Sequence, residues 1–295
     1  MKGMVIRLKK YFKLMRIKHY VKNGLVLLPL LFSGQMSDRV LFGKSILGII
    51  AFCLISSVIY IINDIRDAER DRLHPTKCKR PIANGSVTVK SAWISAVLLL
   101  ASSVVFNYFS TSENLLAWMF IGLYFAINLA YSLGLKGVPI FDIAILASGF
   151  LIRVLYGSAI TGIEVSKWLY LTVISMSFYL GLGKRRNELV KQNDGATRKV
   201  LQFYNYNFLD KNMYMCLALT IVFYSLWSVD PMTIERLSAK SLVWTVPLVI
   251  LICMKYNLIV EGNSDGDPVE VIFKDKLLLG LVIIFGIITI GIIYF

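Results

Sequence analysis

The sequence has few of the side chains that bind transition metals. It contains two histidines, His19 and His74, and four cysteines, none of which belongs to a C-x-x-C pair. Zinc and iron sites are usually built from clusters of those residues, so no such site is expected. Three of the cysteines fall inside apolar runs, where they are expected to pack as small apolar side chains.

Charge is also scarce. Charged residues make up 17% of the 295 residues, and the mean hydropathy is +0.66, whereas soluble domains carry about a quarter charged residues. Apolar runs recur with lengths near the ~20 residues that cross a bilayer core. No small-residue cleavage site follows the basic N-terminus, so no cleavable signal peptide is expected. The composition predicts an all-α, polytopic membrane protein.

Acidic residues are outnumbered by basic ones. The 32 Lys and Arg against 18 Asp and Glu give a net charge of +14, but the bases gather at the ends of apolar runs, as they do in cytoplasmic loops. No nucleic-acid partner is therefore expected. Residues 1–21 are basic and amphipathic and predict an interfacial helix on an anionic leaflet. Residues 22–295 are expected to form one transmembrane domain.

About nine membrane helices are expected in this domain. They are placed at 22–36, 45–63, 89–109, 115–133, 139–160, 166–183, 212–229, 241–258 and 277–295. Most Lys and Arg are then cytoplasmic if the N-terminus is inside and the C-terminus outside, which predicts this orientation in a bacterial-type inner membrane. The chemistry is expected on the cytoplasmic side, in the loops 63–88 and 183–211. The last cytoplasmic loop, EGNSDGDP, is interpreted as an acidic surface turn.

The stretch NDIRDAERDRLHPTKCKRPIANG, residues 63–85, holds four acids and six bases beside an apolar run. Asp64, Asp67 and Asp71 are spaced three and four apart, so a helix that continues past Asn63 would place their carboxylates on one face. Such carboxylates suit Mg²⁺, which shares its coordination with substrate phosphates. The alternative is a solvated helix end whose charges pair with one another.

This stretch resembles the first aspartate-rich motif of the UbiA superfamily of intramembrane prenyltransferases, NDxxDxxxD followed by HPxKxxRP. The resemblance implies a UbiA-like bundle with a polar cavity that faces the cytoplasm. In that superfamily a second aspartate-rich motif follows the sixth span. Here the equivalent segment is GLGKRRNELV, in which Glu188 is the one acid. Its bases cannot hold a second Mg²⁺, but they can bind phosphate directly.

The segments GLGKRRNELV, YSLGLK and DIAILASGFLIR together resemble those of one branch of the superfamily, the decaprenyl-phosphate phosphoribosyltransferases. The resemblance implies transfer of 5-phosphoribose from phosphoribosyl diphosphate to a polyprenyl phosphate, with Mg²⁺ as cofactor and membrane lipids around the enzyme. A homo-oligomer stays open. By motif position, Asp64, Asp67, Asp71 and Asp142 are the candidate catalytic residues, and the first three are the candidate metal ligands. The candidate substrate-binding residues are Lys22, Asn63, Lys77, Arg80, Tyr131, Lys136, Arg153, Lys184, Arg185 and Glu188.

Some of these residues have a second interpretation. Asp142 and Arg153 lie within a predicted span, where charges face a cavity or pair with another helix. Lys22 and Asn23 match a family stretch, but a lysine at a helix end also snorkels. His74 before Pro75 is interpreted as a loop-capping group rather than a base.

Two other functions remain open. A prenyltransferase that uses prenyl diphosphate shares the first motif but is expected to carry acids after the sixth span. A transporter or channel would use the intramembrane charges, but it gives no reason for three aspartates at the cytoplasmic rim.

Overall fold

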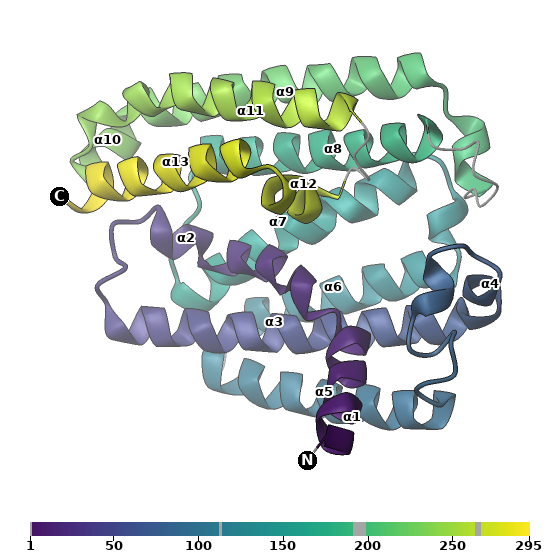
Figure 1. Ribbon diagram of the computed structural model, residues 1–295. Coiled ribbons are helices and arrows are strands. Elements are labelled where there is room, and N and C mark those ends of the chain that lie inside the picture. The colour runs from purple at the N-terminus through teal and green to yellow at the C-terminus, as the bar shows by residue number, and fades with distance from the viewer. Residues whose placement is uncertain (1, 112–113, 191–198, 263–266) are drawn as a thin grey trace.

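The computed structural model describes residues 2–111, 114–190, 199–262 and 267–295, and every regular element within these ranges is a helix (Figure 1). The elements are, in chain order, α1 (Lys2–Met15), η1 (Ile17–Leu27), α2 (Leu28–Leu31), α3 (Arg39–Arg66), α4 (Ala68–Arg72), η2 (Lys77–Lys79), α5 (Val89–Thr111), α6 (Leu115–Leu133), η3 (Leu135–Gly137), α7 (Phe141–Thr161), α8 (Lys167–Val190), η5 (Lys199–Phe203), α9 (Tyr206–Val229), α10 (Pro231–Leu237), η6 (Lys240–Thr245), α11 (Val246–Glu261), α12 (Pro268–Lys274) and α13 (Lys276–Tyr294). The all-α prediction is confirmed.

Seven segments of the described chain are long and apolar enough to cross a membrane, where the sequence predicted about nine. They are α3, α5, α6, α7, α9, the run Lys240–Glu261 and α13. Each overlaps one of the predicted spans. The protein is therefore an integral membrane protein.

The predicted span at 22–36 is corrected by the structure. This segment is the 3₁₀ helix η1 followed by the four-residue α2, and it contains no long α-helix. The segment also lies very close to α7: a Cβ atom on Gly157 would lie 2.0 Å from the carbonyl oxygen of Val26. The η1 backbone therefore packs directly on α7, at a distance that only a glycine allows.

The predicted span at 166–183 is the 24-residue helix α8, which is not among the seven apolar segments. Only its end residues, Lys167 and Val190, are exposed. Because neighbouring helices surround it, its polar residues need not face lipid tails. This packing explains how α8 tolerates more charge than the helices at the rim of the bundle.

Polar side chains begin several of the helices. Asp38 accepts hydrogen bonds from the backbone at the start of α3, Asn114 at the start of α6 and Asn205 at the start of α9. Asp267 and Asp275 cap α12 and α13 in the same way. Side-chain oxygens at these positions satisfy backbone N–H groups that have no partner within the helix.

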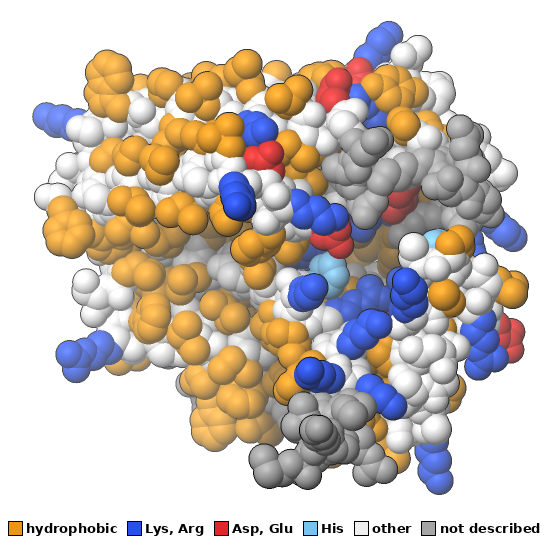
Figure 2. Space-filling model, in the orientation of Figure 1, with side chains coloured by type: hydrophobic (Ala, Val, Ile, Leu, Met, Phe, Trp, Pro, Cys, Tyr) orange, Lys and Arg blue, Asp and Glu red, His pale blue; other side chains and the backbone are white. Residues whose placement is uncertain are grey.

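The core is divided between two halves. One half packs α3, α5, α6 and α7 around the buried residues Phe52, Ile61 and Tyr156, and the other packs α8, α9, α11 and α13 around Leu209 and Trp227. Figure 2 shows Lys and Arg side chains gathered on the half of this face that holds α1 and α4, while hydrophobic side chains cover α9, α11 and α13. The end of the molecule that carries most of these charged side chains is formed by the loop after α3 and the C-terminal ends of α6 and α8.

Candidate active site

The helices enclose three cavities that share lining residues. The aspartate cavity, about 400 Å³, is lined by Asp67, Asp71 and several cations. It shares Asn63, Arg80, Tyr131 and Ser132 with the central cavity of about 220 Å³. The central cavity in turn shares Lys22, Phe150, Leu180 and Pro268 with the apolar cavity of about 600 Å³. The three cavities thus form a series that runs from charged to apolar.

The three motif aspartates lie at a break between two helices. Helix α3 ends at Arg66, Asp67 adopts φ −91° and ψ 4°, and α4 begins at Ala68. The expectation of one uninterrupted helix with all three carboxylates on one face is therefore corrected. Lys136 donates to both oxygens of Asp67, at 2.8 and 2.9 Å, which holds this carboxylate toward the loop between α6 and α7.

Asp64 and Asp71 share one cation. Arg80 Nη1 lies 3.0 Å from Asp64 Oδ1 and 2.6 Å from Asp71 Oδ2. Asp64 is only 2% exposed and also pairs with Arg16. The motif acids are thus neutralised by cations from three other segments, as closely spaced carboxylates require.

The donor set at this position fits Mg²⁺. Asp64 and Asp71 both reach the point that Arg80 Nη1 occupies, and carboxylate oxygens are the ligands that Mg²⁺ prefers. Asp67 follows Asp64 by three residues and lines the adjacent cavity. In the described part of the chain, no three His, Cys, Asp or Glu side chains already converge as a metal centre.

Two of the predicted substrate-binding residues, Tyr131 and Asn63, lie on the wall between the two polar cavities. Tyr131 lines both cavities, and its hydroxyl accepts a hydrogen bond from Arg185 at 3.1 Å. Asn63 also lines both, and its Oδ1 lies 3.4 Å from Ser132 Oγ. Lys77 lines the aspartate cavity. The structure therefore brings Asn63, Lys77, Arg80, Tyr131 and Lys136 together around the aspartates.

The bases after the sixth predicted span diverge. Lys184 lines the central cavity, whereas Arg185 is fully buried and pairs with Asp142 and Glu188. Arg186 points toward α9 and α11, where it pairs with Asp210 and Glu261. Consecutive residues on an α-helix point about 100° apart, so one cluster in the sequence becomes three separate sites. Only Lys184 of these three bases lines any of the three cavities.

Asp142 is fully buried in this network. It accepts a hydrogen bond from Tyr204 at 2.6 Å as well as from Arg185. The pairing with another helix, which the sequence left open for Asp142, is thus observed. Asp142 is not among the lining residues of the three cavities.

Arg153 has a different environment although it lies on the same helix. Its guanidinium donates to Asn23 Oδ1 at 2.7 Å, to Tyr124 Oη at 2.8 Å and to the Gly149 carbonyl. It is 6% exposed and lines the central cavity. No carboxylate within the described ranges forms an ion pair with it, so its positive charge remains available to an anionic ligand.

Lys22 points inward rather than along the surface. Its ammonium group donates to Asp267 at 2.9 Å, and the residue lines both the central and the apolar cavity. His74 acts as the predicted loop cap, since its Nδ1 accepts from the Thr76 backbone at 3.2 Å.

Several charged residues that line the cavities were not among the predicted site residues. They are Arg66, Arg70 and Lys199 in the aspartate cavity and Arg16 and Asp267 in the central cavity. Arg16 lies at the corner between α1 and η1, with φ 54°, and its guanidinium reaches Asp64. Asp267, interpreted as part of a surface turn, lines the central cavity. The Asp-Pro pair at 267–268 is a signal for a helix N-terminus, but only the tertiary structure brings that terminus to the cavity.

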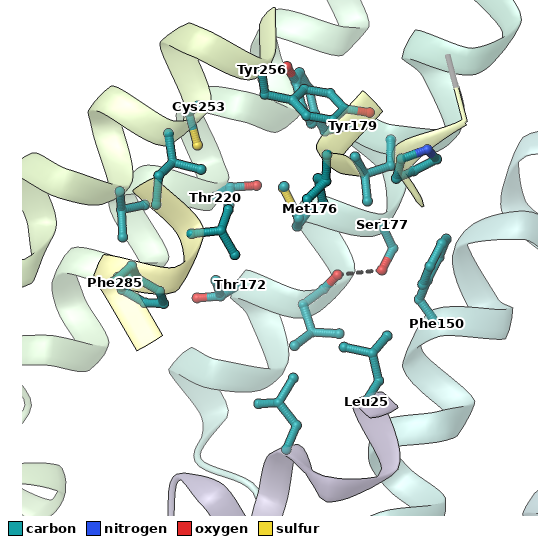
Figure 3. A pocket seen from close by; sticks show the side chains of 18 of the residues that line it. Leu25, Phe150, Thr172, Met176, Ser177, Tyr179, Thr220, Cys253, Tyr256 and Phe285 are labelled. Carbon is teal, nitrogen blue, oxygen red and sulfur yellow. Dashed lines mark hydrogen bonds between the residues drawn. The ribbon is translucent and has the colours of Figure 1, made fainter. Parts of the chain in front are cut away.

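The apolar cavity lies among η1, α7, α8, α9, α11, α12 and α13. Figure 3 shows Leu25, Thr172, Met176 and Phe285 around one open space, with Tyr179 and Tyr256 at its edge. Such a space suits a hydrocarbon chain, because burial of apolar surface is favourable and nothing here requires a charged partner.

Comparison with known proteins places these features in a family. Residues 25–183 match the UbiA prenyltransferase family. The chain is 36% identical over 276 residues to a decaprenyl-phosphate phosphoribosyltransferase of Corynebacterium glutamicum, which covers 90% of this chain and 81% of that protein. It is 37% identical over 279 residues to a protein of the same name from Mycolicibacterium smegmatis, with 90% and 86% covered.

A solved structure has the same fold. The UbiA homolog from Archaeoglobus fulgidus bound to GPP and Mg²⁺ superimposes with a TM-score of 0.72 at 20% identity, over 96% of this chain and 99% of that one. The chain belongs to the UbiA prenyltransferase family and is a transferase.

Proposed function

We propose that this enzyme transfers 5-phosphoribose from phosphoribosyl diphosphate to a polyprenyl phosphate and releases diphosphate, in a reaction that depends on Mg²⁺. The observation that carries this proposal is the series of cavities, in which a cationic cavity with aspartates leads through a second cationic cavity to an apolar one. A soluble donor with several phosphate charges matches the cationic cavities, and a lipid phosphate, which has a charged head and a hydrocarbon tail, matches the step from cationic to apolar. The names of the relatives support the same reaction.

The aspartate cavity is the proposed donor site. Its cations are Arg66, Arg70, Lys77, Arg80, Lys136 and Lys199. This excess over Asp67 and Asp71 favours a ligand with several negative charges. When bound at Asp64, Asp67 and Asp71, Mg²⁺ would neutralise charge that develops on the leaving diphosphate.

The central and apolar cavities together are the proposed acceptor site. Lys22 lines both cavities and Lys184 lines the central one, and their amines can bind a phosphate by charge-assisted hydrogen bonds. The apolar cavity takes the adjoining part of the isoprenoid tail. Arg153 also lines the central cavity and adds positive charge there.

The reaction breaks the bond between the anomeric carbon and the diphosphate oxygen and forms one from that carbon to an oxygen of the lipid phosphate. The acceptor oxygen is already negatively charged, so no strong general base is needed. Arg80, Lys77 and Lys136 bind the oxygens of the donor, and Tyr131 lies between the two sites. In-line displacement inverts the anomeric centre.

Arg185, Glu188 and Asp142 act as positioning residues in this proposal. The buried pair of Arg185 with Asp142 holds the C-terminal part of α8 against α7, and Glu188 on the next turn of α8 pairs with the same guanidinium. We propose that this arrangement directs Lys184 toward the central cavity. Asn63 holds the wall between the cavities. We further propose that the site faces the cytoplasm of an inner membrane, with the N-terminus inside, the C-terminus outside and α1 on the inner leaflet, because the basic end of the molecule is the end with the site.

The proposal is tested with purified enzyme, Mg²⁺, radiolabelled phosphoribosyl diphosphate and a polyprenyl phosphate. Label is expected in the organic phase, and it should be lost when EDTA removes the metal. Asp67→Asn is expected to lower the rate by about 100-fold or more, as expected when a group that supports leaving-group charge is removed.

The matched control is Asp38→Asn, which keeps the cap at the opposite end of α3, about 40 Å away, and should leave the rate unchanged. No labelled lipid with folded protein and several polyprenyl phosphates would contradict phosphoribosyl transfer. A labelled product from a prenyl diphosphate and an aromatic acceptor would then support the alternative, which the GPP-bound structure of a UbiA homolog favours.

A further inference from the structure

A single carboxylate lies where the central cavity meets the apolar cavity. Asp267 Oδ2 accepts a hydrogen bond from Lys22 Nζ at 2.9 Å and lies 3.9 Å from Lys184 Nζ. The next residue, Pro268, lines both cavities, as Lys22 does. The carboxylate and the two ammonium groups therefore occupy the passage between the proposed lipid-tail site and the reaction site.

The charges around this carboxylate are unbalanced. The central cavity is lined by five cations, and Asp267 is the one acid among its described lining residues. Two of the five, Arg16 and Arg80, pair with Asp64, which leaves Lys22, Arg153 and Lys184 with the single charge of Asp267. A carboxylate supplies one negative charge, whereas a phosphate monoester carries about 1.5 to 2 at neutral pH. A phosphate therefore competes well with Asp267 for the two lysines.

Asp267 has two separate roles that use different oxygens. Its Oδ1 accepts from the Val269 backbone at 3.1 Å and begins α12, while Oδ2 binds Lys22. Burial alone raises the pKa of this carboxyl, but Lys22 and Lys184 hold the pKa below its usual value. The group is thus ionised at neutral pH, and its side chain is only 14% exposed.

We propose that Asp267 holds the place of the acceptor's phosphate on Lys22 and Lys184 until the phosphate of an isoprenoid lipid displaces it. This inference rests on the proposed function. In the absence of lipid the carboxylate offsets part of the positive charge of the two lysines and keeps the passage closed. Because only a fraction of the molecules is then ready to bind, the apparent affinity for the lipid is lowered by that fraction. A lipid with a neutral head group cannot displace Asp267 from the two lysines, so it does not open the passage.

The test is direct binding of radiolabelled polyprenyl phosphate to the full-length protein in nanodiscs, without donor. Asp267→Asn removes the charge but keeps the N-cap, since Asn caps helices as well as Asp. The variant is expected to bind the lipid phosphate about 3- to 10-fold more tightly, because the competing ion pair is absent. Polyprenol should bind both proteins weakly and equally.

Asp275→Asn is the matched control, because Asp275 also caps a helix and pairs with a lysine, Lys255 at 2.9 Å. It should leave the lipid affinity unchanged. In a Lys22→Met background, the gain from Asp267→Asn should disappear. Unchanged or weaker lipid binding by folded Asp267→Asn would overturn the proposal, as would an equal gain for polyprenol. A gain in affinity for inorganic phosphate without a gain for the lipid phosphate would also overturn it.

The binding assay separates this inference from the proposed reaction. If lipid phosphate binding behaves as described but no phosphoribosyl transfer occurs, the reaction is wrong and the role of Asp267 stands. In the transfer assay, Asp267→Asn is expected to lower KM for the polyprenyl phosphate and to leave KM for phosphoribosyl diphosphate within about twofold. A KM for the lipid that does not fall would contradict the role of Asp267 even if transfer itself is confirmed.

Discussion

At the scale of the residue, the same kind of side chain has different roles because of what surrounds it. Lys184 and Arg185 are neighbours in the sequence, but one lines the central cavity and the other is fully buried. The motif predicts that both bind phosphate, because the sequence shows their charges but not the direction of their side chains. Burial is what separates the two roles.

Arg185→Met is expected to destabilise the protein by about 3 kcal/mol or more, because it leaves Asp142 buried without its cation. The measurement is the thermal unfolding midpoint in detergent. The double variant with Asp142→Asn should recover part of the loss. An unchanged midpoint, with a raised KM for phosphoribosyl diphosphate, would instead show that Arg185 contacts the donor.

His19 predicts a dependence of stability on pH. Burial and the positive charge of Lys22 lower the pKa of His19 from 6.5 to about 4, and its Nδ1 is buried without a hydrogen-bond partner. The unfolded chain therefore binds a proton that the folded chain does not, so stability is highest above pH 6.5 and falls as the pH drops toward 4.

His19→Gln is therefore expected to show a smaller fall in the unfolding midpoint between pH 7.5 and pH 5.0 than the parent protein. His74→Gln is the control, because His74 lies in a more open loop and should retain most of the fall. Equal pH dependence in the parent and His19→Gln would contradict this account.

At the scale of the element, the close contact between η1 and α7 depends on a glycine. Gly157→Ala places a Cβ atom 2.0 Å from the Val26 carbonyl oxygen, so one backbone must move. We expect a loss of about 1 to 3 kcal/mol and a lower unfolding midpoint. Gly122→Ala, on α6, meets no atom within 4 Å and should be neutral or slightly stabilising, because alanine favours helix more than glycine does.

At the scale of the whole molecule, the separation of charged and apolar surfaces predicts one orientation. Cys78 is half-buried in the proposed cytoplasmic loop, and the other three cysteines are buried. A membrane-impermeant maleimide should label Cys78 in inside-out vesicles and not in intact cells. In a Cys78→Ser protein with Glu235→Cys, at an exposed site after α9, the pattern should reverse. Labelling of Cys78 from outside would contradict the proposed orientation.

The sequence by itself was sufficient for the class of protein. Its hydropathy and apolar runs predicted an all-helical membrane protein, and its aspartate-rich motif predicted the family, because both signals are local. The sequence also predicted that Asn63, Arg80 and the aspartates lie close together, because all of them belong to the end of one helix and the loop after it.

Only the tertiary structure decided which charges meet. It separated Asp67 from Asp64 and Asp71, because α3 ends just before Asp67. Lys136 binds Asp67, whereas Arg80 binds Asp64 and Asp71. It also brought Asp267 beside Lys22, 245 residues away in the chain, through the packing of α12 on η1. Such contacts depend on how separate helices pack, and no local pattern in the sequence records them.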